Sequence, residues 1–172
     1  MIPKANNHHI SKTAGYIASA LPQVMATTGA VFGPDYLWHI NNPNNSDWYI
    51  DSEKPALALN AFFKFYSNLS IPIATDIQHA LFFEGRDLCD NEAYRHLLDK
   101  YEINHQAFYK LLKSPEIKTQ TYADFELVKS WGIKGFPVVL LQTEPKKLVL
   151  LSEGFVTVEE LEKKVEEFGG EI

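Results

Sequence analysis

Cysteine is almost absent from this sequence. Of its 172 residues one is a cysteine, Cys89, so these residues can form neither an internal disulfide nor a cysteine-based zinc site. The N-terminal segment up to Tyr16 lacks the apolar stretch of a signal peptide, and no segment approaches the ~20 apolar residues of a membrane span. We therefore expect a protein of the reducing cytoplasm, where disulfides are rare, that does not act at a membrane.

Basic runs are lacking as well. The 16 Lys and Arg residues face 22 Asp and Glu residues, for a net charge of -6, and we expect no binding to nucleic acid because nothing would neutralise its phosphates. Walker, Rossmann and G-x-S-x-G motifs are missing, so we predict no cofactor. What is present is a hydrophobic fraction of 45%, typical of a globular domain.

Helical periodicity extends over most of the chain up to Gly132. It predicts a helix from Ser11 to about Thr28 that is kinked or broken at Pro22. Residues 29–52 are rich in turn-forming residues and aromatics, which is typical of a packed irregular loop. Five further helices are expected. They comprise two between Pro55 and Arg86, one over about 91–101, one capped by Asn104, and one that begins at Pro115 and ends before Gly132.

The last quarter of the chain has a different pattern. Residues 138–141 and 148–151 are short apolar runs on either side of a turn, which predicts a β-hairpin. Thr157 and Glu160 have the spacing of a capping box that opens a final helix. Because both strands are apolar along their length, we expect them to be buried on both faces. Two strands alone make a poor sheet, so a further element should cover them.

Three segments resemble one family. The run from Ala123 to Pro137 (ADFELVKSWGIKGFP) resembles the approach to the cis-proline strand of thioredoxin-fold proteins. Residues 48–58 (WYIDSEKPALA) and 84–87, followed by a capped helix, resemble the inserted helical domain of the DsbA-like family. The nearest branch is the FrnE-type one, close to the 2-hydroxychromene-2-carboxylate isomerases. The resemblance covers residues 27–168.

The resemblance implies an α/β protein with a thioredoxin-like, DsbA-like fold and a large all-helical insertion. Residues 1–122 would be the insertion with its leading helix, and residues 123–172 the C-terminal thioredoxin half of helix, cis-proline strand, strand and helix. The family pattern begins with a strand, a Cys-x-x-Cys or a serine at a helix N-terminus, and a second strand. This sequence has no counterpart of these elements, so we expect the N-terminal thioredoxin half to be missing.

The resemblance also implies a substrate-binding loop at Gly135, Phe136 and Pro137. The Phe136–Pro137 peptide bond would be cis, and the backbone before it would pair with an extended substrate as an added strand. The alternative is that Pro137 merely begins a strand, a position that proline tolerates. Even with a cis bond the loop would be a binding element and not a catalyst.

No residue is predicted to be catalytic. Cys89 precedes an expected helix, where a thiol pKa can fall, but it lacks a resolving cysteine and Asp90 would oppose its ionisation. We expect a packed or capping residue there. The histidines show no metal-binding spacing. His8 and His9 are expected to be solvated, and His79 and His96 to lie at the surface or half-buried.

The aromatic residues between 62 and 66 allow two interpretations, namely packing within the helical block or a groove for apolar ligands or peptides, and we favour the first. The family implies a protein-disulfide oxidoreductase or isomerase that acts on peptide or protein thiols, but with one cysteine the chain itself is expected to be redox-inactive. The alternatives are a non-enzymatic peptide-binding module, or a relative of glutathione-dependent isomerases and transferases that also lacks their serine. The strand after Pro137 would have an unpaired edge, which a homodimer or a rearranged N-terminal segment would cover.

Overall fold

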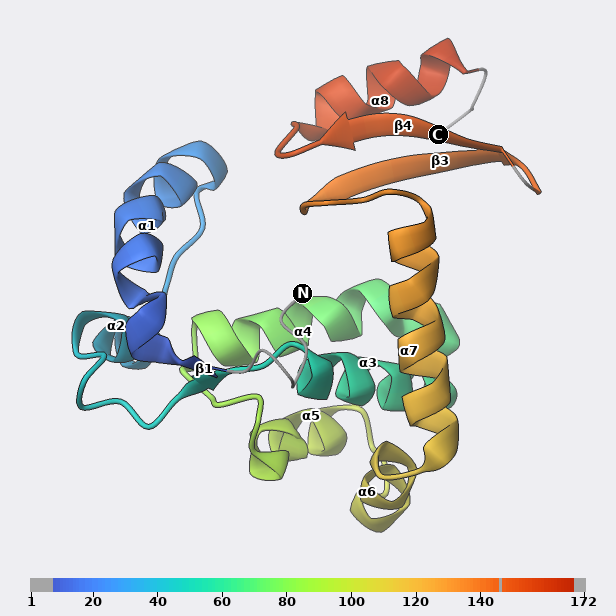
Figure 1. Cartoon of the computed structure of the whole chain (residues 1–172). Coiled ribbons are helices and arrows are strands. Elements are labelled where there is room, and N and C mark those ends of the chain that lie inside the picture. The colour runs from blue at the N-terminus through green and yellow to red at the C-terminus, as the bar shows by residue number, and fades with distance from the viewer. Residues whose placement is uncertain (1–7, 146, 169–172) are drawn as a thin grey trace. The chain divides into compact units, whose positions relative to one another are not determined.

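The structure is a computed structural model that describes residues 8–145 and 147–168 (Figure 1). The chain divides into two compact units, Met1–Thr121 and Tyr122–Ile172. We call their described parts the helical unit (residues 8–121) and the hairpin unit (residues 122–168). No helix within the described ranges is long and apolar enough to cross a membrane.

The helical unit contains most of the secondary structure, and one short antiparallel pair, β1 with β2, joins its first described residues to the segment before α3. Its elements are β1 (His8–His9), η2 (Ile10–Lys12), α1 (Ala14–Thr28), α2 (Pro34–Asn41), β2 (Tyr49–Ile50), α3 (Glu53–Phe65), η3 (Ser67–Leu69), α4 (Ser70–Phe82), η4 (Asn91–Tyr94), α5 (Arg95–Lys100), α6 (His105–Leu112) and the first part of α7 (Pro115–Ser130).

The main core of the helical unit is aromatic. Phe62 of α3, Tyr94 of η4 and Phe108 of α6 are all fully buried, and the ring centroids of Phe62 and Phe108 lie 4.6 Å apart. Asn104 accepts a hydrogen bond from the Ala107 amide and caps α6 as the sequence predicts. The packing interpretation of the aromatic run therefore holds for Phe62.

A second core cluster lies between η2, α1 and α2, in the region where we expected an irregular loop. That expectation was wrong for residues 34–41, because α2 is a regular helix in which Tyr36 and Ile40, one turn apart, face the cluster. Pro34 in its first turn favours the start of the helix. Helix α1 also runs unbroken through Pro22. The carbonyl that Pro22 leaves without a helical partner belongs to Ala18, which is exposed and open to water.

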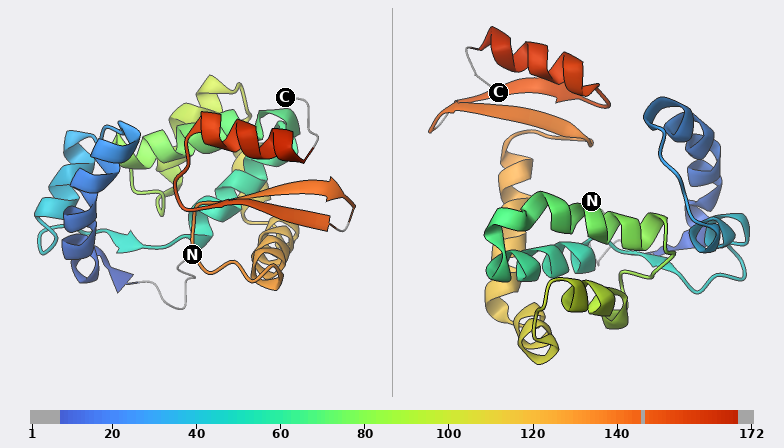
Figure 2. Two further views of the ribbon diagram at one scale, coloured as in Figure 1. Left: turned by 90° about the horizontal axis from the view of Figure 1, so that it is seen from above. Right: turned by 180° about the vertical axis from the view of Figure 1, so that it is seen from behind.

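The hairpin unit consists of the rest of α7, β3 (Val138–Glu144), β4 (Lys147–Glu153) and α8 (Val158–Glu167). The two strands pair antiparallel, and α8 lies along them (Figure 2). The capping box of Thr157 and Glu160 is present, and Lys164 donates a 2.6 Å hydrogen bond to the Leu151 carbonyl. The hairpin and the capping box are thus confirmed.

The strands are not buried on both faces, contrary to our expectation. Leu151 is 4% exposed, but Leu150 beside it is 56% exposed. The register places Leu140 opposite Leu150, so these two side chains share one face of the hairpin. With only two described strands in this sheet, one apolar face stays open.

Candidate functional site

The segment between α7 and β3 forms an exposed loop. Gly132 ends α7 with a left-handed φ of +72°. The Phe136–Pro137 peptide bond is cis, as the resemblance implies. Gly135, Phe136 and Pro137 are all exposed, Phe136 to 61%. The Gly154 amide donates a 2.8 Å hydrogen bond to the Pro137 carbonyl and fixes the loop against the end of β4.

The loop leads into an edge of the sheet. Within the described ranges β3 pairs with β4 and with no other strand, so the second edge of β3 presents backbone N–H and C=O groups without a strand partner. A hollow of about 380 Å³ lies beside it. It is lined by the open face of the hairpin, including Val138, Leu140 and Leu150, and by Trp131 and Ile133 of the loop.

Cys89 belongs to the helical unit. Its thiol donates a 3.8 Å hydrogen bond to the Tyr49 carbonyl. Burial, together with the charges of Asp87 and Asp51, raises the pKa of the thiol to about 12. The helix cap beside it is Asp90, whose side chain accepts from the Glu92 amide. Cys89 is thus a protonated, half-buried thiol with little nucleophilic character.

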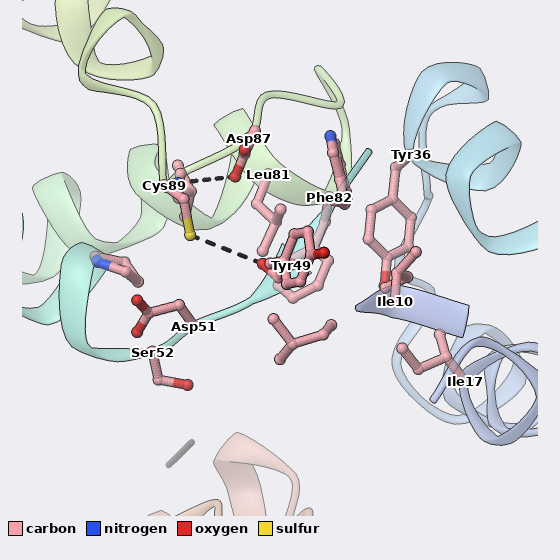
Figure 3. A pocket seen from close by; sticks show the side chains of 14 residues that line it. Ile10, Ile17, Tyr36, Tyr49, Asp51, Ser52, Leu81, Phe82, Asp87 and Cys89 are labelled. Atoms are coloured by element: carbon pink, nitrogen blue, oxygen red, sulfur yellow. Dashed lines mark hydrogen bonds between the residues drawn. The ribbon is translucent and has the colours of Figure 1, made fainter. Parts of the chain in front are cut away.

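An apolar pocket of about 360 Å³ adjoins Cys89 (Figure 3). Ile10, Tyr36 and Trp48 form its floor, and Asp51 and Asp87 lie among its polar lining residues. The sequence did not indicate this pocket, because its walls come from segments far apart in the chain. One local signal was available, since each aspartate accepts a hydrogen bond from the backbone amide two residues later, a typical Asx turn.

The histidines take structural positions. His79 and His96 both lie 3.3 Å from the Glu84 carboxylate, which also pairs with Arg86. Burial alone would raise the pKa of Glu84, but the Arg86 hydrogen bond and the His96 charge outweigh it and lower that pKa. No group of three metal-ligating side chains occurs in the ranges that the structure describes.

The expectation that His8 and His9 are solvated was wrong. Both are half-buried in β1, and the His9 Nε2 atom lies 2.7 Å from the Ser46 carbonyl oxygen. The cause is the pairing of this segment with β2, which the polar composition of the N-terminal residues did not indicate.

Three solved structures share the fold. A candidate protein disulfide isomerase from Nitrosomonas europaea matches with a TM-score of 0.80 and 22% identity over 91% of this chain and 74% of that one. The cytosolic disulfide reductase DsbM from Pseudomonas aeruginosa matches with a TM-score of 0.66 and 22% identity over 81% of this chain and 67% of DsbM. DsbM with GSH matches with a TM-score of 0.60 and 23% identity, over 76% and 62%.

The chain is therefore structurally similar to DsbA-like disulfide isomerase and reductase structures, and it is a mostly helical α/β protein of that fold. At these identities the likeness shows the fold and not an activity. No protein-family model and no curated protein matches the chain. With one cysteine, these 172 residues contain no Cys-x-x-Cys motif.

Proposed function

We propose that this chain binds extended peptide segments of thiol-containing proteins along the free edge of β3, next to Gly135, Phe136 and Pro137. The observation that supports this most is the edge itself, which has no strand partner within the described ranges. Such an edge can accept an extended peptide as an added strand, whose main-chain hydrogen bonds supply affinity.

The side chains beside the edge support the same interpretation. Phe136 and Leu150 are more than half exposed, and Leu140 and Leu150 line the adjacent hollow. Alternate side chains of an added strand would point to this face. Covering apolar surface here stabilises a complex by about 25 cal/mol per Å² removed from water, before the costs of association.

In this role the chain holds thiol substrates and does not exchange disulfides by itself. Exchange within one chain proceeds through a mixed disulfide that a second thiol resolves, and Cys89 is the one cysteine of these residues. The raised pKa of its thiol, about 12, also keeps the attacking thiolate scarce at neutral pH. A reducing cytoplasmic location fits a thiol substrate, and DsbM is described as cytosolic.

Calorimetric titration tests the proposal. The ligand is a short peptide of alternating Val and Thr around one cysteine, and its control is the same peptide with alternate backbone amides N-methylated. We expect the first to bind and the second not to bind, because strand addition needs the amide donors. Serine in place of the peptide cysteine should keep most of the affinity. Equal binding of the methylated peptide would contradict strand addition.

A matched pair of variants locates the site. Leu150→Lys places a charge in the hollow beside the edge, whereas Leu127→Lys alters an α7 leucine of similar exposure, 49%, that does not line it. We expect the first variant to weaken peptide binding about tenfold or more and the second to leave it unchanged. Equal effects would place the binding surface elsewhere.

A second candidate ligand is glutathione, because a structure of DsbM with GSH shares this fold. Glutathione is itself a short thiol peptide, so the same loop could receive it. Titration with glutathione and with S-methylglutathione would distinguish the two candidates. Tight binding of glutathione together with no binding of the Val/Thr peptide would favour a relative of glutathione-dependent enzymes over a peptide-binding module.

A homodimer through the same edge stays a further proposal. A second copy of β3 would compete with the peptide, so sedimentation velocity over a range of protein concentrations should then show a dimer that the peptide dissociates. A monomer at all concentrations would leave peptides as the proposed occupants of the edge.

A further inference from the structure

The pocket of the helical unit is not used by the proposed function. It has a volume of about 360 Å³, within the range of small-molecule sites. The walls come from η2 and α1, from α2, from β2 and the residues around it, from the end of α4, and from the segment that follows α4. All of them belong to the helical unit, so the pocket does not depend on the placement of the hairpin unit.

The floor of the pocket is rigid and apolar. Ile10, Tyr36 and Trp48 are each at least 93% buried and belong to the second core cluster, which supports them from behind. Trp48 is held by stacking on His39, with centroids 3.8 Å apart, and by a 3.1 Å hydrogen bond from its amide to the Ser46 hydroxyl. The apolar part of a ligand would displace water from these residues without a rearrangement of the protein.

Two fixed carboxylates give the pocket its charge. One oxygen of Asp51 accepts from the Glu53 amide at 2.8 Å, and one oxygen of Asp87 accepts from the Cys89 amide at 2.8 Å (Figure 3). Each carboxylate keeps the capacity to accept further hydrogen bonds, although that of Asp87 also interacts with the Cys89 thiol. Neither aspartate forms an ion pair with any residue in the described ranges.

The neighbouring cation does not cancel this charge. The Lys54 ammonium donates a 2.5 Å hydrogen bond to the Cys89 carbonyl oxygen and pairs with neither carboxylate. The two carboxylates and the one ammonium together give this part of the pocket a net negative charge. An anionic ligand would be repelled there, while a cation would find two carboxylates that have no ion-pair partner within the described ranges.

We propose that this pocket binds a small aromatic or alicyclic molecule that carries a protonated amine. The ring lies against Ile10, Tyr36 and Trp48, and the ammonium donates hydrogen bonds to the carboxylates of Asp51 and Asp87.

Three probes of similar size test this inference in the full chain, namely benzylamine, benzyl alcohol and benzoate. We expect calorimetry or ligand-observed NMR to show that benzylamine binds about tenfold more tightly than benzyl alcohol, because its positive charge is attracted to both carboxylates and the neutral alcohol has no such charge. Benzoate should not bind. Equal affinity of the amine and the alcohol, or binding of none of the probes, would overturn the proposal.

The variant Asp51→Asn/Asp87→Asn keeps both oxygens that accept the backbone amides and removes both charges. We expect it to abolish the advantage of benzylamine over benzyl alcohol. The matched control is Asp90→Asn, which alters an aspartate in a similar turn, accepting from the Glu92 amide at 3.1 Å, outside the pocket. An undiminished preference for the amine in the double variant, with its circular dichroism unchanged, would overturn the proposal.

Cys89 reports where the probe binds, because it lines the pocket and is the one thiol of the chain. Saturating benzylamine should slow the reaction of this thiol with a small alkylating reagent several-fold, and benzoate should not. Amine binding that leaves the thiol reaction rate unchanged would place the amine elsewhere and contradict the assignment.

Discussion

The helical unit and the hairpin unit differ in where they keep their apolar side chains. In the helical unit Phe62, Tyr94 and Phe108 are fully buried in one cluster. In the described part of the hairpin unit, Leu151 is the one apolar residue that is fully buried, while Phe136 and Phe155 are 61% and 56% exposed. The helical unit therefore has a hydrophobic core of its own, whereas the described part of the hairpin unit has few buried apolar side chains.

The difference indicates what each unit is suited for. A core of interlocked aromatic rings resists change and holds the pocket beside Trp48 in a fixed shape. An open sheet face with a free strand edge gains stability from whatever covers it. We therefore expect core substitutions in the helical unit to affect stability most, and substitutions in the hairpin unit to affect binding more than stability.

The largest effect should come from Phe62→Ala. It removes a fully buried ring that contacts the ring of Phe108, and we expect it to lower the free energy of unfolding by about 3–5 kcal/mol. The matched change Phe155→Ala, in the hairpin unit, should cost less than about 1 kcal/mol because that ring is already mostly hydrated. Urea unfolding followed by circular dichroism measures both. Similar losses would remove the contrast between the units.

Alanine substitutions at two glycines test the same comparison between the units, with a smaller expected effect on stability. A Cβ at Gly33, which precedes α2, would overlap the backbone carbonyl of Phe83, whereas a Cβ at Gly135 meets open space. Gly33→Ala should therefore destabilise the protein by about 1–3 kcal/mol, and Gly135→Ala by less than about 0.5 kcal/mol. Thermal unfolding measures both changes. A large loss at Gly135 would mean that its loop is packed rather than open.

Mild acid should lower the stability of the helical unit and leave that of the hairpin unit unchanged. Burial lowers the pKa of His39 and of His96 below 6.5, although nearby acidic groups oppose the shift. The unfolded chain then binds more protons than the folded chain, so stability falls as the pH drops from about 6.5 toward the lower folded pKa. All six histidines lie before residue 106. Residue-resolved hydrogen exchange at about pH 7.5 and about pH 5.5 should show faster opening in the helical unit alone.

Local signals in the sequence predicted the hairpin unit better than the rest. The capping box at Thr157 and the end of α7 before Gly132 each follow from a few adjacent residues, the cis bond at Pro137 was implied by the family resemblance, and all three are present. The short helix α2 was missed because eight residues carry too little periodicity against a turn-rich composition. The pocket was missed for a different reason, since it joins Ile10 to segments about forty and eighty residues away.

The candidate site, too, was only partly predictable from the sequence. The sequence indicated the loop at Gly135, Phe136 and Pro137, but it could not indicate that one face of the hairpin stays open. The apolar runs of β3 and β4 predict burial, and exposure of Leu150 depends on what packs against the sheet. Periodicity along a strand does not contain that information.

Amide chemical shifts and hydrogen exchange during titration with the Val/Thr peptide test the central claim most directly. We predict that the amides of Gly135, Phe136 and Val138–Leu141 shift and gain protection, while the amides of fully buried core residues such as Phe62 and Leu98 stay unchanged. Peptide binding that perturbs the helical unit and leaves the β3 edge exchanging freely would contradict the account.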